Sequence, residues 1–167
     1  QAAEVLAEAH ARFRAILDSL DALVDVADLE TYELLYINPK GRELFGDVEG
    51  RKCWEVIQEG QTGPCPFCTN DRLVDAEGRS IGPIRWEFLN TRNGKWFDII
   101  DRAITWHDGR LVRLEVATDI TERKRMEDEL KRAEERWKFA LEGGGEGVWD
   151  WNLETNEVFF SKIWKAL

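Results

Sequence analysis

Residues 117–124 read Ala-Thr-Asp-Ile-Thr-Glu-Arg-Lys and separate two segments of different pattern. Before them, Leu111–Thr118 is rich in apolar and β-branched residues, as a strand is. After them, residues 122–142 form a long charged segment, as an exposed helix does. The Asp119 side chain is suited to accept from the free N–H groups of a first helical turn, and Glu122 follows three residues later, as in a capping box. The stretch therefore predicts a strand that ends where a helix begins.

The composition limits both the size and the partners of the protein. Its 167 residues have room for one domain of roughly 100–150 residues and an incomplete additional piece. The formal net charge is −10 and the sequence pI is about 4.8, so the overall field repels phosphate backbones and anionic membrane surfaces. Lys and Arg are scattered among acidic residues. The composition therefore disfavours nucleic-acid binding and direct membrane contact.

The expected localisation follows from segments that the sequence lacks. No stretch approaches the roughly 20 apolar residues that cross a bilayer, and the first residues do not resemble a signal peptide. The three cysteines are an odd number, and two of them are only three positions apart, unlike the disulfide framework of a secreted domain. We therefore expect a cytoplasmic protein.

An internal repeat organises the chain. Residues 12–17 (Arg-Phe-Arg-Ala-Ile-Leu) align with residues 136–141 (Arg-Trp-Lys-Phe-Ala-Leu), which lie 124 positions later. Without a gap, the same offset aligns Leu-Glu-Thr at 29–31 with Leu-Glu-Thr at 153–155. The second copy has too few strands in this sequence to cover its apolar face. We predict that residues 143–167 are disordered, docked on the first domain or swapped with another chain.

The segments between the two copies predict an α+β fold. Asn-Gly at 93–94 and Asp-Gly at 108–109 are tight-hairpin dipeptides, so the last three strands should pair antiparallel. Asn-Pro at 38–39 suits an N-cap followed by the first turn of a helix. Helices are grouped after the second strand, which is typical of an α+β protein. The expected strands are Ala22–Ala27, Glu33–Ile37, Ile84–Asn90, Lys95–Trp106 and Leu111–Thr118, with a short helix over Lys40–Leu44.

The order of elements and three motifs resemble a PAS sensor domain. The string at 119–124 is similar to the strand-to-linker junction, or PAC motif, that closes such domains. The stretches 64–70 and 101–110 are similar to a subset of PAS domains in bacterial sensor histidine kinases and GGDEF diguanylate cyclases. The resemblance implies a PAS-like five-stranded antiparallel sheet with inserted short helices, flanked by amphipathic helices. The implied domains are an N-terminal helix at 1–20, a PAS domain at 21–121, a linker helix at 122–142 and the truncated start of a second PAS domain at 143–167.

The two flanking helices carry apolar stripes at heptad-like spacing. Each stripe either packs on its own domain or forms the seam of a parallel homodimer, and the PAS resemblance favours the homodimer. The first stripe is Ala2, Leu6, Ala9, Phe13, Ile16 and Leu20. The second stripe is Met126, Leu130, Ala133, Trp137 and Ala140.

The motif Cys65-Pro-Phe-Cys68, with Cys53 twelve residues earlier, permits three interpretations. As small apolar side chains, the cysteines would pack an irregular loop that Pro64 and Pro66 stiffen. As a redox pair, Cys65 and Cys68 would resemble a glutaredoxin string, but that chemistry favours a helix N-terminus and this motif follows a loop. As a metal site, Cys53, Cys65 and Cys68 would supply three thiolates without a fourth cysteine. We predict free thiols and no stoichiometric metal.

Strand alternation predicts which side chains face the interior. The interior is either filled by these side chains or holds a small planar ligand between aromatic rings, and we expect it to be filled. The nominated residues are Val24, Val26, Trp86, Phe88, Phe97 and Ile99 from the strands, with Trp54 and Phe67 from the helical side.

Charged residues also fall within the last three strands. We expect them to pair across strands on a solvated or interface-facing side of the sheet. The alternative is that Arg102 or Arg113 contacts an anionic ligand such as a small carboxylate. The charged residues are Glu87, Asp101, Arg102, Arg113 and Glu115.

No cofactor and no catalytic residues are predicted. The Asn-Cys-Arg string of flavin-photoreceptor PAS domains is absent, and neither His10 nor His107 is placed as an axial haem ligand. Gly143–Gly147 lacks the rest of a diguanylate cyclase signature, and no phosphate-binding loop or Ser/His/Asp arrangement occurs. The fragment is expected to be non-catalytic, while its parent is expected to be a histidine kinase or a diguanylate cyclase.

The expected function is sensory. The resemblance implies a PAS region of a bacterial signalling protein that passes a ligand, redox or partner signal through the linker helix to a downstream output domain. Asp119 and Thr121 would couple the last strand to that helix. Two alternatives stay open: a ligand-free dimerisation module, and a thiol switch at Cys65 and Cys68.

Overall fold

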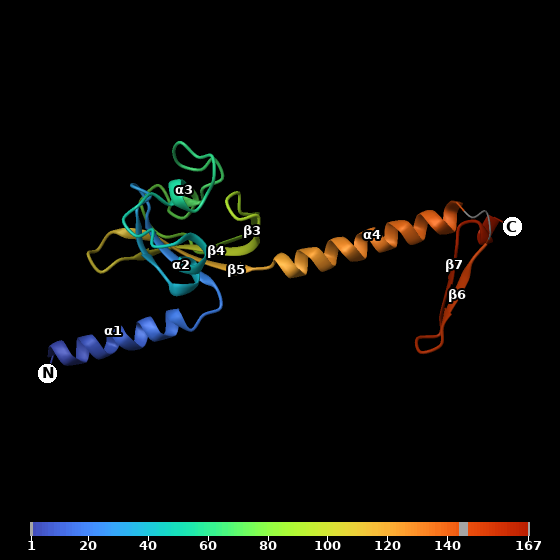
Figure 1. The fold of residues 1–167 in the computed structure, drawn as a ribbon, viewed down its shortest axis with the longest axis horizontal. Coiled ribbons are helices and arrows are strands. Elements are labelled where there is room, and N and C mark those ends of the chain that lie inside the picture. The colour runs from blue at the N-terminus through green and yellow to red at the C-terminus, as the bar shows by residue number, and fades with distance from the viewer. Residues whose placement is uncertain (1, 144–146, 167) are drawn as a thin grey trace. The chain divides into compact units, whose positions relative to one another are not determined.

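The computed structural model of the protein (Figure 1) describes residues 2–143 and 147–166. The chain divides into two compact units, one comprising residues 1–121 and the other residues 122–167. Among the described helices, none has both the length and the apolar character that crossing a membrane requires.

The first unit contains a sheet, three short helical segments and a longer N-terminal helix. Its helical segments are α1 (Ala2–Asp18), α2 (Pro39–Phe45), α3 (Cys53–Val56) and the 3₁₀ turn η1 (Asn70–Arg72). Its strands are β1 (Leu23–Asp28), β2 (Leu34–Ile37), β3 (Ile84–Leu89), β4 (Trp96–Thr105) and β5 (Leu111–Asp119).

The five strands form one antiparallel sheet in the order β2-β1-β5-β4-β3, which confirms the predicted α+β fold. β5 is the last strand of the first unit in sequence but lies at the centre of the sheet, between β1 and β4. The two predicted hairpins join β3, β4 and β5. Gly94 and Gly109 in these turns have φ angles of 68° and 89°, which residues with a Cβ atom rarely adopt.

The segments between β2 and β3 cover one side of the sheet, here named the inner face. Leu23 of β1, Phe97 of β4 and Ala117 of β5 are buried together on this face. Ala27 packs in a second buried cluster with Cys53 of α3. Because side chains alternate along a strand, every second residue of β1, β4 and β5 lies on the inner face.

The predicted N-cap of α2 is confirmed. The Asn38 side chain accepts a hydrogen bond from the Gly41 N–H at 3.0 Å. Pro39 occupies the first helical position, where its missing N–H is harmless. Gly41 lies so close to Ile37 that an added Cβ atom would collide with the Ile37 side chain. Glycine at this position therefore lets α2 pack directly against the end of β2.

The second unit consists of a long helix and a two-stranded hairpin. Its elements are α4 (Thr121–Gly143), β6 (Trp149–Asn152), β7 (Glu157–Phe160) and the 3₁₀ turn η2 (Trp164–Ala166). Because β6 and β7 pair in register, the expectation of disorder is wrong for the described residues of 143–167. Residues 144–146 and 167 lie outside the described residues.

The turn of this hairpin has the same side-chain hydrogen bonds as the β1–β2 turn and a positive φ at the same position. Asp28 Oδ1 accepts hydrogen bonds from the backbone N–H groups two and three residues later, at 3.0 and 2.8 Å. Asn152, 124 positions after Asp28, accepts from the same relative positions at 2.9 and 3.2 Å. Tyr32 and Asn156, also 124 positions apart, both have a positive φ, of 62° and 57°. The sequence repeat is therefore also a repeat of backbone conformation.

The end of the second strand is repeated as well. Asn38 Oδ1 accepts hydrogen bonds from the Val24 N–H and from the Gly41 N–H, both at 3.0 Å. Gly41 is three residues after Asn38. Ser161 Oγ accepts hydrogen bonds from the Val148 N–H at 3.0 Å and from the Trp164 N–H at 3.3 Å. Trp164 is likewise three residues after Ser161. The offset changes by one residue because the pairing of β1 with β2 contains a bulge, whereas β6 and β7 pair without one.

Candidate functional site

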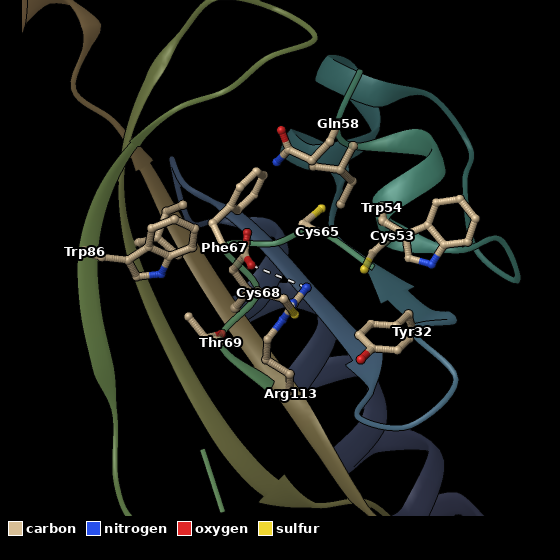
Figure 2. A pocket seen from close by; sticks show the side chains of 13 residues that line it. Tyr32, Cys53, Trp54, Gln58, Cys65, Phe67, Cys68, Thr69, Trp86 and Arg113 are labelled. Atoms are coloured by element: carbon tan, nitrogen blue, oxygen red, sulfur yellow. Dashed lines mark hydrogen bonds and ion pairs between the residues drawn. The ribbon is translucent and has the colours of Figure 1, made fainter. Parts of the chain in front are cut away.

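A small cavity lies between the inner face and the segments that cover it (Figure 2). Its volume is about 40 Å³, against roughly 300–1,000 Å³ for typical ligand pockets. Aromatic side chains supply much of its wall, and in Figure 2 Phe67 and Trp86 lie on one side and Tyr32 and Trp54 on the other. In this conformation the interior is mostly filled by side chains and has room only for molecules near the size of water.

Phe67 closes the cavity by packing on aromatic residues of β3. Its ring centroid lies 4.4 Å from that of Phe88 and 6.3 Å from that of Trp86. Trp86 and Phe88 are themselves 5.2 Å apart. Tilted rings at these separations interact favourably beyond the area they bury. The loop that carries the cysteine motif is thus held over the sheet by its own phenylalanine.

All three cysteines line this cavity (Figure 2), which the sequence did not predict. Cys53, Cys65 and Cys68 are free thiols. Burial raises the pKa of Cys53 to about 12 and that of Cys65 to about 11. A thiol with a raised pKa is protonated near neutrality and reacts slowly, because the thiolate is the nucleophile. Among the described residues, no group of three His, Cys, Asp or Glu side chains is arranged to hold a metal ion.

Three carboxyl groups form a row across the centre of the inner face. Asp25 of β1 pairs directly with Glu115 of β5, and Glu115 pairs directly with Asp101 of β4. Asp25 and Asp101 are both 0% exposed, and the Glu115 side chain is 12% exposed. Directly opposed residues in an antiparallel sheet point to the same side, so the row is continuous.

Arg113 is the cation that contacts this row. It lies two residues before Glu115 on β5, and its side chain is 7% exposed. Its guanidinium nitrogens lie 3.4 Å from Glu115, 3.6 Å from Asp25 and 3.8 Å from Asp101. It also donates to Asn70 Oδ1 at 3.3 Å. One guanidinium is therefore shared among three carboxyl groups.

Neutral donors satisfy only part of this cluster. Asp101 Oδ2 accepts from the Thr69 hydroxyl and from the Trp86 indole N–H, both at 2.8 Å. Among the described residues, both carboxyl oxygens of Asp25 and the Oδ1 of Asp101 are buried without a hydrogen-bond donor. Unsatisfied buried carboxylates are costly, and protonation lowers that cost.

Burial is the largest influence on the pKa values of Asp25 and Glu115 in this row. It raises the pKa of Asp25 to about 6; Arg113 opposes the rise and Asp101 adds to it. Burial and then Asp25 raise the pKa of Glu115 well above its usual range, and Arg113 again opposes. The two groups interact, so they titrate as a pair.

The structure brings together most of the residues nominated for the interior. Trp54, Phe67, Trp86, Ile99 and Arg113 line the cavity. Phe88, Phe97 and Ile99 line a neighbouring cavity of about 20 Å³, which Glu115 also lines.

Three nominated residues lie elsewhere, which corrects the placement predicted for them. Val24 and Val26 are buried, but they alternate with Leu23, Asp25 and Ala27 and so point to the opposite face of β1. Arg102 is exposed on β4 and alternates with the inner-face residue Asp101. For the two valines the cause is that both faces of β1 are buried, so an apolar side chain in this strand does not mark the inner face.

The acidic row was only partly anticipated from the sequence. Asp101, Arg113 and Glu115 were expected to pair across strands on a solvated or interface-facing side, whereas they lie inside. Asp25 was not singled out, because an acidic residue between two valines is typical of a half-exposed strand. The register that places Asp25 opposite Glu115 exists only in the folded sheet.

The strand-to-helix junction is tied to the start of β4. Asp119 Oδ1 accepts from the Thr121 N–H at 2.9 Å and from the Thr121 hydroxyl at 2.6 Å. Thr121 Oγ1 accepts from the Trp96 N–H at 3.0 Å, and the Ile120 N–H donates to the Trp96 carbonyl at 2.8 Å. Lys95 Nζ lies 2.7 Å from Asp119 Oδ2. Although burial raises it, hydrogen bonds from Lys95 and Thr121 lower the pKa of Asp119 on balance.

This geometry corrects the predicted capping box. Asp119 bonds to Thr121, two positions later, which is the geometry of an Asx turn and not that of a capping box with Glu122. The hydroxyl of Thr121 then links the turn to the neighbouring strand. The junction is therefore held by β4 as well as by the helix start.

Comparison with known proteins identifies this architecture. Residues 11–78 match a sequence model described as a PAS domain. Over this stretch, which is less than half of the chain, the sequence is similar to PAS domains. PAS domains are sensory domains of signalling proteins and are in general not catalytic. No curated protein sequence matches this chain.

Solved structures support the PAS fold. The PAS domain of an HTR-like protein from Haloarcula marismortui superposes with a TM-score of 0.54 and 21% sequence identity, over 70% of this chain and 96% of that one. An RNA-binding light-oxygen-voltage receptor superposes with a TM-score of 0.55 and 22% identity, over 77% of this chain and 38% of that one. At such identities the likeness concerns the fold.

Proposed function

We propose that this PAS domain is the sensory region of a bacterial signalling protein and that it passes its signal through α4 to a downstream output domain. The observation that carries the proposal is the Asp119–Thr121 junction, which bonds the first residue of α4 to Trp96 at the start of β4. A helix that is hydrogen-bonded to β4 and continuous with β5 follows the displacement of these strands more closely than a helix that is joined to one strand by a flexible linker. Movement of the sheet thus becomes rotation or a change of register of the helix.

The route from the interior to the junction is short. Glu115 and Arg113 line the cavity and belong to β5. The same strand ends at Asp119, four residues after Glu115. β4, which carries Asp101 and Ile99 on the inner face, begins at Trp96, the partner of Thr121. Of the strands that line the cavity, β4 and β5 therefore lead to the junction.

The output domain in this proposal is a histidine kinase or a diguanylate cyclase, and residues 143–167 begin a second PAS domain. The repeated turn at Asn152 and the repeated cap at Ser161 support the second part. In that arrangement α4 connects two consecutive sensory domains, and Asp119 and Thr121 act as coupling residues.

The flanking helices support a parallel homodimer. Phe13 and Ile16 of α1 are 61% and 62% exposed, and Leu130 and Trp137 of α4 are 63% and 62% exposed. Large apolar side chains at these spacings are typical of a helix seam. The same stripe would also serve a scaffold that aligns output domains without a ligand, which is the second candidate function. The raised pKa values of Cys53 and Cys65 count against a thiol switch.

Amide hydrogen exchange of α4 tests the coupling. Glu115→Gln alters the charge at the cavity wall with little change in shape, and it should alter exchange in residues 122–130. Combining it with Thr121→Val, which removes the hydroxyl bound to Trp96, should abolish that response. Glu30→Gln, at an exposed turn position, and Thr118→Val, at an exposed position of β5, are the matched controls. Unchanged exchange in Glu115→Gln would contradict transmission and favour the scaffold.

A further inference from the structure

The acidic row on the inner face has more negative groups than the contacts around it can neutralise. With every group ionised, Asp25, Asp101 and Glu115 carry three negative charges against the single positive charge of Arg113. The guanidinium approaches two of the carboxyl groups no closer than 3.6 Å, which is an ion pair but not a hydrogen bond. The excess charge is buried, and among the described residues no donor bonds to either oxygen of Asp25 or to Oδ1 of Asp101.

Within the described part of the chain, the elements packed against the row add no positive charge. The titratable groups that face it are Cys53 from α3, Cys65 and Cys68 from the loop, and Tyr32 from the β1–β2 turn. Each of these is neutral when protonated and negative when ionised. The remaining contacts come from the neutral side chains of Thr69, Trp86 and Asn70.

Protonation of the row lowers its excess charge and adds hydrogen-bond donors to it. A protonated carboxyl group carries one negative charge less and gains an O–H donor. Asp25 and Asp101 each lie directly beside Glu115 in the sheet register, so the donor has an acceptor within the row. Two carboxyl groups that share a site hold a proton more tightly than an isolated one, because both cannot ionise cheaply together.

We propose that Asp25, Glu115 and Asp101 form a shared proton-binding site and that loss of its protons to solvent, as the pH rises, is an input that this domain senses. The sensing part rests on the proposed function, because it uses β5 and the junction as the route to α4. Glu115 and Arg113 also line the cavity, so the ionised form has a place to take up water.

The raised pKa values of Asp25 and Glu115 agree with this geometry. Below about pH 6 Asp25 holds a proton, and the raised pKa of Glu115 favours its protonated form as well. As the pH rises, the site becomes negative and the sheet interior is strained by unpaired charge.

The second repeat does not carry this site. By the offset of 124 residues, Trp149 occupies the position of Asp25 and Trp151 that of Ala27. Trp149 pairs with Phe160 and Trp151 with Val158, so that face of the β6–β7 hairpin is apolar. The proton site is therefore a feature of the first domain and not of the common scaffold.

Carboxyl-carbon NMR titration of the whole chain tests the site directly. In the wild type, two side-chain carboxyl signals should titrate clearly above the usual range of Asp and Glu, one of them near pH 6. Asp25→Asn should remove one of them and lower the midpoint of the other, because the two groups interact. Glu115→Gln should do the converse. Asp28→Asn, on the same strand as Asp25 but on its opposite face, should leave both signals in place.

The wild-type titration alone decides the proposal if a variant fails to fold. Titration of every Asp and Glu below about pH 5 would overturn it and would leave the transmission proposal standing. Two high midpoints that shift independently would overturn the shared site. A second measurement follows exchange of the Trp96 and Ile120 amides, which form the junction bonds, through the same pH range. High midpoints with an unresponsive junction would establish the proton site and contradict the proposed coupling.

Discussion

At the residue scale, the identity of a side chain says less about this protein than the partner that the sheet register gives it. Asp25 lies in an ordinary strand sequence, yet it is 0% exposed and opposes Glu115. Arg113 has a strongly basic group, yet it is enclosed by carboxyl groups. An anionic ligand at Arg113 would have to displace or approach these carboxyl groups, so the surroundings favour a proton or a cation there over an anion.

Asp25→Asn should flatten the pH dependence of stability. The folded pKa of Asp25 is raised from 3.8 to about 6, so the folded state holds more protons than the unfolded state within this window. The free energy of unfolding therefore falls as the pH rises through it, by at most about 1.4 kcal/mol per pH unit for one proton. The stabilisation is complete below the unfolded pKa and is lost as the pH passes the folded pKa.

Urea unfolding at several pH values between about 4.5 and 7 measures this slope. Asp28 and Asp119 have lowered pKa values, so their contributions are lost only as the pH falls below about 4, outside the window. A slope in Asp25→Asn equal to that of the wild type would show that Asp25 takes no part.

At the element scale, the conformation of the β1–β2 turn occurs a second time in the β6–β7 turn. Asp28 and Asn152 make the same pair of backbone hydrogen bonds, so the turn needs a side-chain oxygen and not a charge. Asp28 also pairs with Arg110 at 2.6 Å, and the Arg110 side chain is 46% exposed. An ion pair of that exposure contributes little to stability.

Asp28→Ala should therefore destabilise the first unit far more than Asp28→Asn. The alanine variant leaves two backbone N–H groups without their acceptor, at a cost of about 1–3 kcal/mol. The asparagine variant keeps an oxygen in the same place, as Asn152 does, and should lose less than about 1 kcal/mol. Chemical denaturation of both variants at about pH 7 measures the difference. Equal losses would show that the ion pair with Arg110, and not the turn, is what Asp28 provides.

At the scale of the whole molecule, large apolar side chains are exposed in stripes along α1 and α4. Met126, Leu130 and Trp137 are each more than half exposed along α4. The charged residues between them make ion pairs along the helix, such as Arg123 with Glu127 at 2.5 Å. An apolar stripe bordered by such pairs is typical of a helix that associates with another helix.

Leu130→Glu should weaken self-association of the chain. A charged side chain in the seam removes apolar burial and places two acidic groups against each other in a parallel pair. Sedimentation velocity should show a dimer for the wild type and a shift towards monomer for the variant, with at least a tenfold weaker association, which corresponds to about 1.4 kcal/mol. Lys131→Glu, the neighbouring position outside the stripe, is the control and should stay dimeric. Equal association of both variants would mean that α4 is not the seam.

Local patterns in the sequence were sufficient for much of the fold. The dipeptides at 93–94 and 108–109 predicted two hairpins, the Asn-Pro pair at 38–39 predicted the start of α2, and the charged run after residue 121 predicted α4. Each of these signals acts over a few residues, where turn chemistry and capping dominate. The 124-residue repeat in the sequence reappears in the hydrogen bonds of Asp28 and Asn152.

The sequence by itself determined the strands, the turns, the repeat and the place where β5 ends and α4 begins, because these depend on neighbours along the chain. Only the tertiary structure decided which face of β1 is the interior, and therefore that Asp25 and not Val26 points inward. It also decided that Thr121 bonds to Trp96 and that three cysteines line one cavity. These contacts join residues far apart in the chain, and their pairing depends on the register of β1, β5 and β4, which no local pattern contains.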